Sequence, residues 1–144
     1  MAFKHPVSVL VVIYARDTGR VLMLQRRDDP GFWQSVTGSQ EPGETLAETA
    51  MREVKEELGI DVNARQLTVV DCQRQIQFEI FAQFRHRYAP DVTHNSEHWF
   101  SLALPEEWDV SLSEHLALQW LPPAEAAVLT KSWSNRQAIE EFVI

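Results

Sequence analysis

At residues 38–60 the chain reads GSQEPGETLAETAMREVKEELGI, and this stretch decides its fold. A Pro-Gly pair predicts a turn, and Thr45 followed by Glu48 forms a capping-box pattern that predicts the start of a helix. Apolar residues then recur every four positions from Leu46 to Leu58, which gives the helix one apolar face for a core. Gly59 supplies the left-handed residue that ends a helix. The stretch therefore predicts a turn followed by an amphipathic helix.

Three glutamates gather on one side of this helix. Glu53, Glu56 and Glu57 stand at positions i, i+3 and i+4. Glu53 and Glu57 fall at the edge of the apolar face, and Glu56 lies further toward solvent. Like charges at this spacing repel each other, and a bound divalent cation would remove the repulsion. An ordinary solvated helix surface is the alternative, because most glutamates are exposed.

The spacing of the whole stretch resembles the Nudix box. Gly38 is followed after five residues by Glu44, and after seven more by Arg52-Glu53-Val54-Lys55-Glu56-Glu57-Leu58-Gly59-Ile60. The resemblance implies an α/β fold, the Nudix α/β/α sandwich, with a mixed β-sheet and a loop–helix–loop metal site. It also implies hydrolysis of a nucleoside diphosphate that is linked to a further group.

The same resemblance implies roles for individual residues. Glu53, Glu56 and Glu57 would bind Mg²⁺, with Mn²⁺ as a substitute, and Glu114 would reach the metal from across the cleft. The catalytic residues would be Glu53, Glu57 and Glu114, with Glu53 as first candidate for the general base and Glu114 as second. The structural residues of the box would be those that shape its loop and helix: Gly38, which allows a tight turn, Glu44, which contacts Arg52, and Gly59.

Composition narrows the class of protein. We expect residues 1–144 to form one domain, and five Trp and seven Phe supply large side chains for its core. The formal net charge of −8 argues against nucleic-acid binding. The single cysteine, Cys72, is expected to be buried and structural, which suits the cytoplasm. The apolar run Val7–Ala15 is too short to span a membrane and predicts a central strand. We expect a monomer or a weak homo-oligomer.

Periodicity and turn residues predict the remaining elements. Strands are expected at Val7–Ala15, Val21–Gln25, Leu67–Gln73, Ile76–Phe84 and Trp99–Leu104. Asp17-Thr18-Gly19 predicts a hairpin turn between the first two strands. Pro122-Pro123 predicts a short helix through Leu129, and Ser134 is expected to cap a last helix over residues 135–142.

Stretches outside the box resemble one group of Nudix enzymes, the bacterial dihydroneopterin triphosphate pyrophosphohydrolases. These stretches cover residues 6–14, 21–30, 32–39, 85–90, 114–116 and 129–139. The implied reaction releases pyrophosphate from dihydroneopterin triphosphate in folate biosynthesis, with dATP and other nucleoside triphosphates as further substrates. Two alternatives remain: a nucleotide-pool pyrophosphohydrolase that prefers dATP or an oxidised purine triphosphate, and a Nudix module that binds a nucleotide without cleaving it.

Several residues are candidates for binding a small triphosphate substrate. Arg26 could grip a phosphate, or it could be an ordinary surface arginine. Lys4 could neutralise another phosphate, and Thr37 and Ser132 could donate hydrogen bonds. The run Phe78-Glu79-Ile80-Phe81 alternates, and we expect it to supply the wall for a flat ring, with core packing as the alternative for any one Phe. His115, beside Glu114, either tunes the site or is exposed.

Overall fold

The computed structural model describes residues 3–143, and these form a mixed seven-stranded sheet between helices. The strands are β1 (Val7–Ala15), β2 (Val21–Arg26), β3 (Trp33–Gln34), β4 (Val36–Ser39), β5 (Val69–Glu79), β6 (His94–Leu104) and β7 (His115–Leu121). The helices are α1 (Leu46–Leu58), the 3₁₀ helix η1 (Ala82–Arg87), α2 (Pro123–Leu129) and α3 (Trp133–Phe142). Within residues 3–143, no helix has the length and apolar content needed to cross a membrane.

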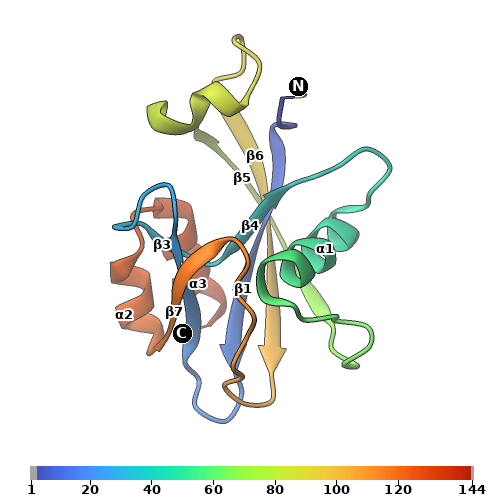
Figure 1. Cartoon of the computed structure of the whole chain (residues 1–144), viewed down its shortest axis with the longest axis vertical. Coiled ribbons are helices and arrows are strands. Elements are labelled where there is room, and N and C mark those ends of the chain that lie inside the picture. Colours follow the sequence, from blue (N-terminus) through green and yellow to red (C-terminus); the bar gives the residue numbers. More distant parts are fainter. Residues whose placement is uncertain (1–2, 144) are drawn as a thin grey trace.

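The sheet runs in the order β3-β2-β1-β6-β5, with β4 paired to β1 and β7 paired to β2. β1 and β6 are parallel, whereas the other strand pairs are antiparallel, including the β1–β2 hairpin around Gly19. Helix α1 covers one face of the sheet, and α2 and α3 cover the other, as Figure 1 shows. The predicted α/β/α arrangement with a mixed sheet is confirmed.

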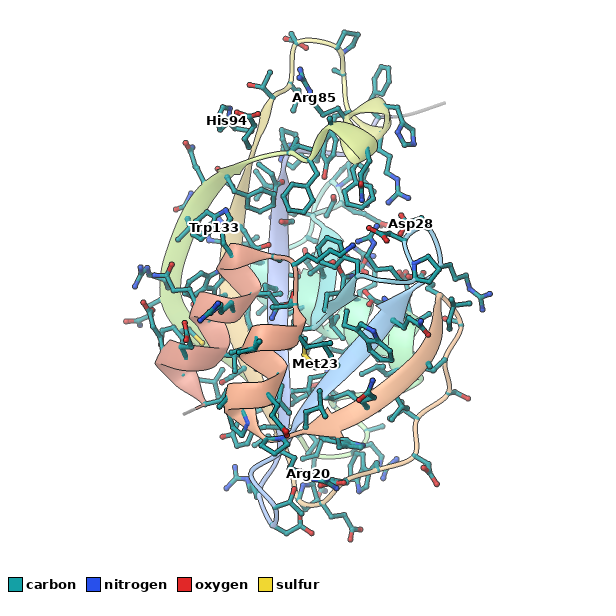
Figure 2. All side chains as sticks on the ribbon, turned by 90° about the vertical axis from the view of Figure 1, so that its left-hand side faces the viewer. Arg20, Met23, Asp28, Arg85, His94 and Trp133 are labelled. Carbon is teal, nitrogen blue, oxygen red and sulfur yellow. The ribbon has the colours of Figure 1, made fainter. Side chains whose placement is uncertain are left out.

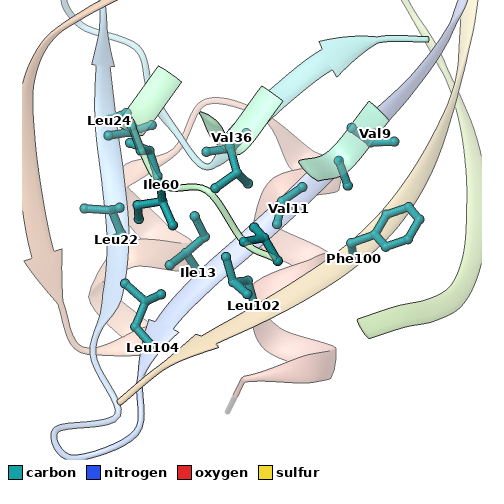
Figure 3. Packing of buried hydrophobic residues seen from close by; sticks show 14 residues of the cluster. Val9, Val11, Ile13, Leu22, Leu24, Val36, Ile60, Phe100, Leu102 and Leu104 are labelled. Carbon is teal, nitrogen blue, oxygen red and sulfur yellow. The ribbon is translucent and has the colours of Figure 1, made fainter. Parts of the chain in front are cut away.

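Two apolar clusters lie on the two faces of the sheet. Val9, Val11 and Ile13 of β1 pack toward α1 in one cluster (Figure 3), and Leu10 and Val12 pack in the other cluster with residues of α2 and α3. Because β1 is buried on both faces, it reads as an unbroken apolar run rather than an alternating one. This is why the sequence predicts β1 at its observed bounds.

Helix α1 begins and ends where its local signals predict. The Thr45 side chain accepts a hydrogen bond from the Glu48 backbone at 3.1 Å, and Glu48 accepts one from the Thr45 backbone at 2.8 Å. Gly59 follows the helix with φ of 71°, a left-handed conformation that glycine adopts without steric cost.

The structure corrects the prediction for residues 67–84. These residues were expected to form two strands, but β5 runs unbroken from Val69 to Glu79. A shift in register between Asp71 and Gln75, with Gln73 at φ of 55°, absorbs the interruption as a bulge. Beyond β5 the chain turns into η1 instead of continuing as a strand. Cys72, on β5, is half-buried rather than fully buried.

Other boundaries also differ from expectation. β6 begins at His94 rather than Trp99. The prediction missed its first residues because they are all polar and show no alternation of apolar and polar side chains. α3 begins at Trp133, and Ser132 rather than Ser134 caps it by accepting from the Asn135 backbone at 3.2 Å. The short strands β3 and β4, and also β7, were not predicted.

Candidate active site

Three carboxylates from two parts of the chain meet at one end of α1. Glu53 and Glu57 come from the helix, and Glu114 comes from the turn before β7. One oxygen atom from each lies within 4.8 Å of the others. The structure therefore brings together three of the four residues expected to bind metal.

Glu57 is the most buried of the three, with 1% of its surface exposed. Within residues 3–143, neither of its carboxylate oxygens has a hydrogen-bond partner. Burial raises the pKa of Glu57 far above its ordinary value, and the neighbouring Glu53 and Glu114 raise it further. Unpaired buried oxygens among like charges are unfavourable in the protein alone, and they are the oxygen ligands that Mg²⁺ and similar hard cations prefer. The residues present fit a divalent cation.

His115 lies beside this cluster without neutralising it. It is buried at the start of β7, with Nε2 3.7 Å from Glu57 Oε1. Burial lowers the pKa of His115 to about 4, and the nearby Arg26 and Arg27 lower it as well. The imidazole is therefore neutral near pH 7, and it does not offset the negative charge of the carboxylates. The structure excludes the alternative that His115 is exposed.

Gly38 makes room for Glu53. A Cβ atom at Gly38 would lie 2.0 Å from Glu53 Cδ, closer than two carbon atoms can approach. The predicted reason for this glycine, a tight turn, is wrong: Gly38 lies within β4, where it pairs with Val9 of β1. Its role is to let the sheet and the carboxylate of α1 come into direct contact.

Arg52 ties the helix to the loop before it. Its guanidinium donates to both carboxylate oxygens of Glu44, at 2.6 and 3.1 Å, and to the Ser39 carbonyl at 2.9 Å. The bond from Arg52 lowers the pKa of Glu44 to about 2. Arg52 Nη1 also donates to Glu53 at 2.6 Å and to Glu56 at 3.2 Å. Glu56 is thus directed to Arg52 and lies outside the close group of three.

Three adjoining openings surround the carboxylates, and Lys4 and Thr37 line all three. One of these openings is an aromatic pocket, and another contains Glu57 and Glu114. Arg26 and Arg87 line both of them and so lie between the carboxylates and the aromatic pocket. Asp28 accepts two hydrogen bonds from Arg26, at 2.7 and 2.6 Å, and one from Arg87 at 2.6 Å. These bonds lower the pKa of Asp28 to about 2. A cationic zone thus separates the carboxylates from the aromatic pocket.

The aromatic pocket is open to solvent on one side and has a cavity volume of about 120 Å³. Phe78, Ile80, Phe81 and Ser132, all expected to contact substrate, line it. Phe81 enters the pocket because the chain leaves β5 there, and its ring lies 5.9 Å from that of Phe32. Glu79 does not line the pocket: it is exposed on the other face of the strand. Trp133 and Asp28 lie on either side of this end of the sheet, beneath η1 (Figure 2).

Sequence reasoning missed several residues that line these openings. They are Phe32, Gln34, Phe84, Arg87, Tyr88, Asn95, Glu97, Trp133 and Asn135. Asn95 and Glu97 carried no local signal, since residues 94–98 are all polar and show no alternation.

Comparison with known proteins decides the family. The model of the NUDIX domain family matches residues 4–142. This chain belongs to the Nudix family. It is 69% identical over 142 residues to the dihydroneopterin triphosphate diphosphatase of Escherichia coli K12, covering 99% of this chain and 95% of that protein. It is 49% identical to the Haemophilus influenzae enzyme of the same name, covering 99% and 90%. The solved structure of the E. coli dihydroneopterin triphosphate pyrophosphohydrolase superposes with a TM-score of 0.97 at 68% identity, covering 99% of this Nudix chain and 98% of that one.

Proposed function

We propose that this Nudix protein hydrolyses dihydroneopterin triphosphate to dihydroneopterin monophosphate and pyrophosphate. The observation that carries the proposal is the cluster of Glu53, Glu57 and Glu114 beside a cationic zone and an aromatic pocket. The 69% identity to an enzyme with this substrate in its name supports the choice of pterin over other rings. Retention of the three carboxylates argues against a module that only binds its ligand.

Glu53, Glu57 and Glu114 would hold Mg²⁺, or Mn²⁺ in its place, and Glu56, which lines one opening together with Glu53 and Glu114, would take an outer position. A divalent cation supplies Lewis-acid chemistry there, neutralising charge on the phosphoryl oxygens and acidifying the attacking water. Glu53 accepts the proton from that water, with Arg52 fixing one of its oxygens at 2.6 Å. Glu114 is the second candidate for this role.

The substrate would lie along the three openings. Its triphosphate contacts Lys4, Arg26 and Arg87, whose positive charges offset the phosphates. Thr37 and Ser132 donate hydrogen bonds to the substrate. The flat ring enters the aromatic pocket between Phe78, Ile80 and Phe81.

We further infer that residues 1–144 act as one domain on this small-molecule substrate in the cytoplasm. The net charge of −8 supports the absence of nucleic acid among its partners. We expect a monomer or a weak homo-oligomer, which sedimentation of the purified protein would test.

The purified chain would be incubated with dihydroneopterin triphosphate and, separately, with dATP, each with and without Mg²⁺, and pyrophosphate would be quantified apart from orthophosphate. We expect Mg²⁺-dependent pyrophosphate release that is faster from the pterin substrate. Release of pyrophosphate mainly from dATP would indicate that the protein acts in nucleotide metabolism instead. Orthophosphate as the product would contradict the proposed reaction.

A further inference from the structure

Two buried polar side chains at the floor of the aromatic pocket take no part in the chemistry at Glu57. Asn95 and Glu97 stand two residues apart on β6 and therefore point to the same face of the sheet. They are 2% and 4% exposed, and both line the pocket. On this face Phe78 is the β5 residue opposite Asn95, which puts an aromatic ring beside them.

The side-chain carbonyl oxygen of Asn95 is a hydrogen-bond acceptor that no donor of the described residues satisfies. Its Nδ2 donates to Ser8 Oγ at 2.6 Å, which directs the amide. Its Oδ1 has no hydrogen-bond partner in the described part of the chain. A buried carbonyl oxygen in this condition is unfavourable unless a ligand supplies an N–H group.

Glu97 has acceptor capacity left as well. A carboxylate offers about four acceptor positions. Trp99 Nε1 donates to Oε1 at 3.0 Å, which occupies one of these positions. Burial raises the pKa of Glu97 to about 7. Unlike Glu57, it has no second carboxylate with which to hold a cation, so neutral N–H donors are its fitting partners.

We propose that Asn95 and Glu97 recognise a ring edge that presents a ring N–H beside an exocyclic amine, the 2-amino-4-oxopyrimidine edge that pterins and guanine share. The inference rests on the proposed function and deepens it. The ring N–H and one amine hydrogen meet the carboxylate of Glu97, and the other amine hydrogen meets Asn95 Oδ1. Adenine presents a ring nitrogen acceptor next to its amine, so its lone pair would face the carboxylate and be repelled. The pair therefore selects the ring while Phe78 and Ile80 pack against its flat faces.

The test compares three triphosphates in three proteins. The second-order rate constant kcat/KM for pyrophosphate release would be measured with dihydroneopterin triphosphate, dGTP and dATP. The proteins are the whole chain, Glu97→Gln, and the control Glu125→Gln, which changes an exposed carboxyl on α2. We expect Glu97→Gln to lower kcat/KM about 10- to 150-fold for the pterin and dGTP and less than about 3-fold for dATP. Glu125→Gln should leave all three unchanged.

Equal losses on all three substrates, or none, would overturn the proposal. Should Glu97→Gln fail to fold, Asn95→Leu tests the same edge and should show the same selective loss. Binding of neopterin, which carries no phosphate, should weaken in both variants independently of the chemistry. If the unmodified chain cleaves nucleotides but not the pterin triphosphate, the proposed function fails on its own. The ratio of dGTP to dATP rates then still decides whether Glu97 recognises this edge.

Discussion

Glu57 and Glu97 are both buried carboxyls, but they have opposite surroundings. Glu57 lies among Glu53 and Glu114, and within residues 3–143 its oxygens have no hydrogen-bond partner. Glu97 lines the aromatic pocket, where Trp99 donates a hydrogen bond to it. Burial raises the pKa of both. The difference shows that burial alone does not define a role for a carboxyl: crowding by like charge favours a cation, and isolation among neutral donors favours a neutral ligand.

Removing the charge of Glu57 should have the largest effect. We expect Glu57→Gln to lower kcat on every triphosphate by about 10³-fold, because charge stabilisation by a metal contributes several kcal/mol to the barrier. The melting temperature should rise with Mg²⁺ in the unmodified protein and not in the variant. Calorimetric scans with and without Mg²⁺ check this. An unchanged Mg²⁺ response in Glu57→Gln would place the cation elsewhere.

Filling the space at Gly38 should disturb the acidic region, because this glycine lies against the Glu53 carboxylate. A methyl group there displaces the Glu53 carboxylate, and we expect Gly38→Ala to lower kcat about 10²-fold, since small misplacements of catalytic groups have effects of that size. Gly31→Ala is the matched control, because its nearest neighbour is the flexible end of Lys131 at 3.3 Å. Comparable losses in both variants would remove the special role of Gly38.

The pH dependence of stability should reveal Glu97. Its pKa is raised from 4.5 to about 7 in the folded protein. The folded state therefore binds more protons between these values, and the stability contributed below pH 4.5 is lost as the pH rises through 7. The shift corresponds to about 3 kcal/mol. Urea unfolding at several pH values should show a smaller decline in Glu97→Gln than in the unmodified chain. Parallel curves would contradict the raised pKa.

The smallest effect on catalysis is expected from a change in the cationic zone, which lies between the carboxylates and the aromatic pocket. Asp28 fixes Arg26 and Arg87, so Asp28→Asn should raise KM for the triphosphate about 3- to 5-fold with little change in kcat, as partly exposed ion pairs contribute at most about 1 kcal/mol. Glu107→Gln is the control. It breaks a similar pair with Arg20, which lies at the lower end of the molecule in Figure 2, well away from Asp28. Steady-state kinetics would compare them, and an equal rise in KM in both variants would refute a local effect.

The two regions also differ in how well the sequence predicts them. The acidic region is largely local: Glu53 and Glu57 share one helix whose caps, Thr45 and Gly59, are visible in the sequence. The reason for Gly38 was wrong, because it depends on contact between β4 and α1, which no local pattern records. Glu114 was found through the family resemblance rather than from its surroundings.

The aromatic region depends on contacts between distant segments. Its lining comes from β1 to β6, η1 and α3, and it forms only when these meet. The alternation that identified Phe78 and Ile80 is local, but it also suggested Glu79, which the strand directs outward. Arg87 reaches the cationic zone through Asp28, 59 residues away in the chain. Periodicity carries no information on such pairings.

A double-mutant cycle on dihydroneopterin triphosphate tests most directly whether the two buried carboxyls have separate roles. The values of kcat/KM would be measured for the unmodified chain, Glu57→Gln, Glu97→Gln and the double variant. Independent roles predict that the two losses multiply, with free energies additive to within about 0.5 kcal/mol. A double variant no slower than Glu57→Gln alone would show that both carboxyls act on one step, contradicting the division between chemistry at Glu57 and ring recognition at Glu97.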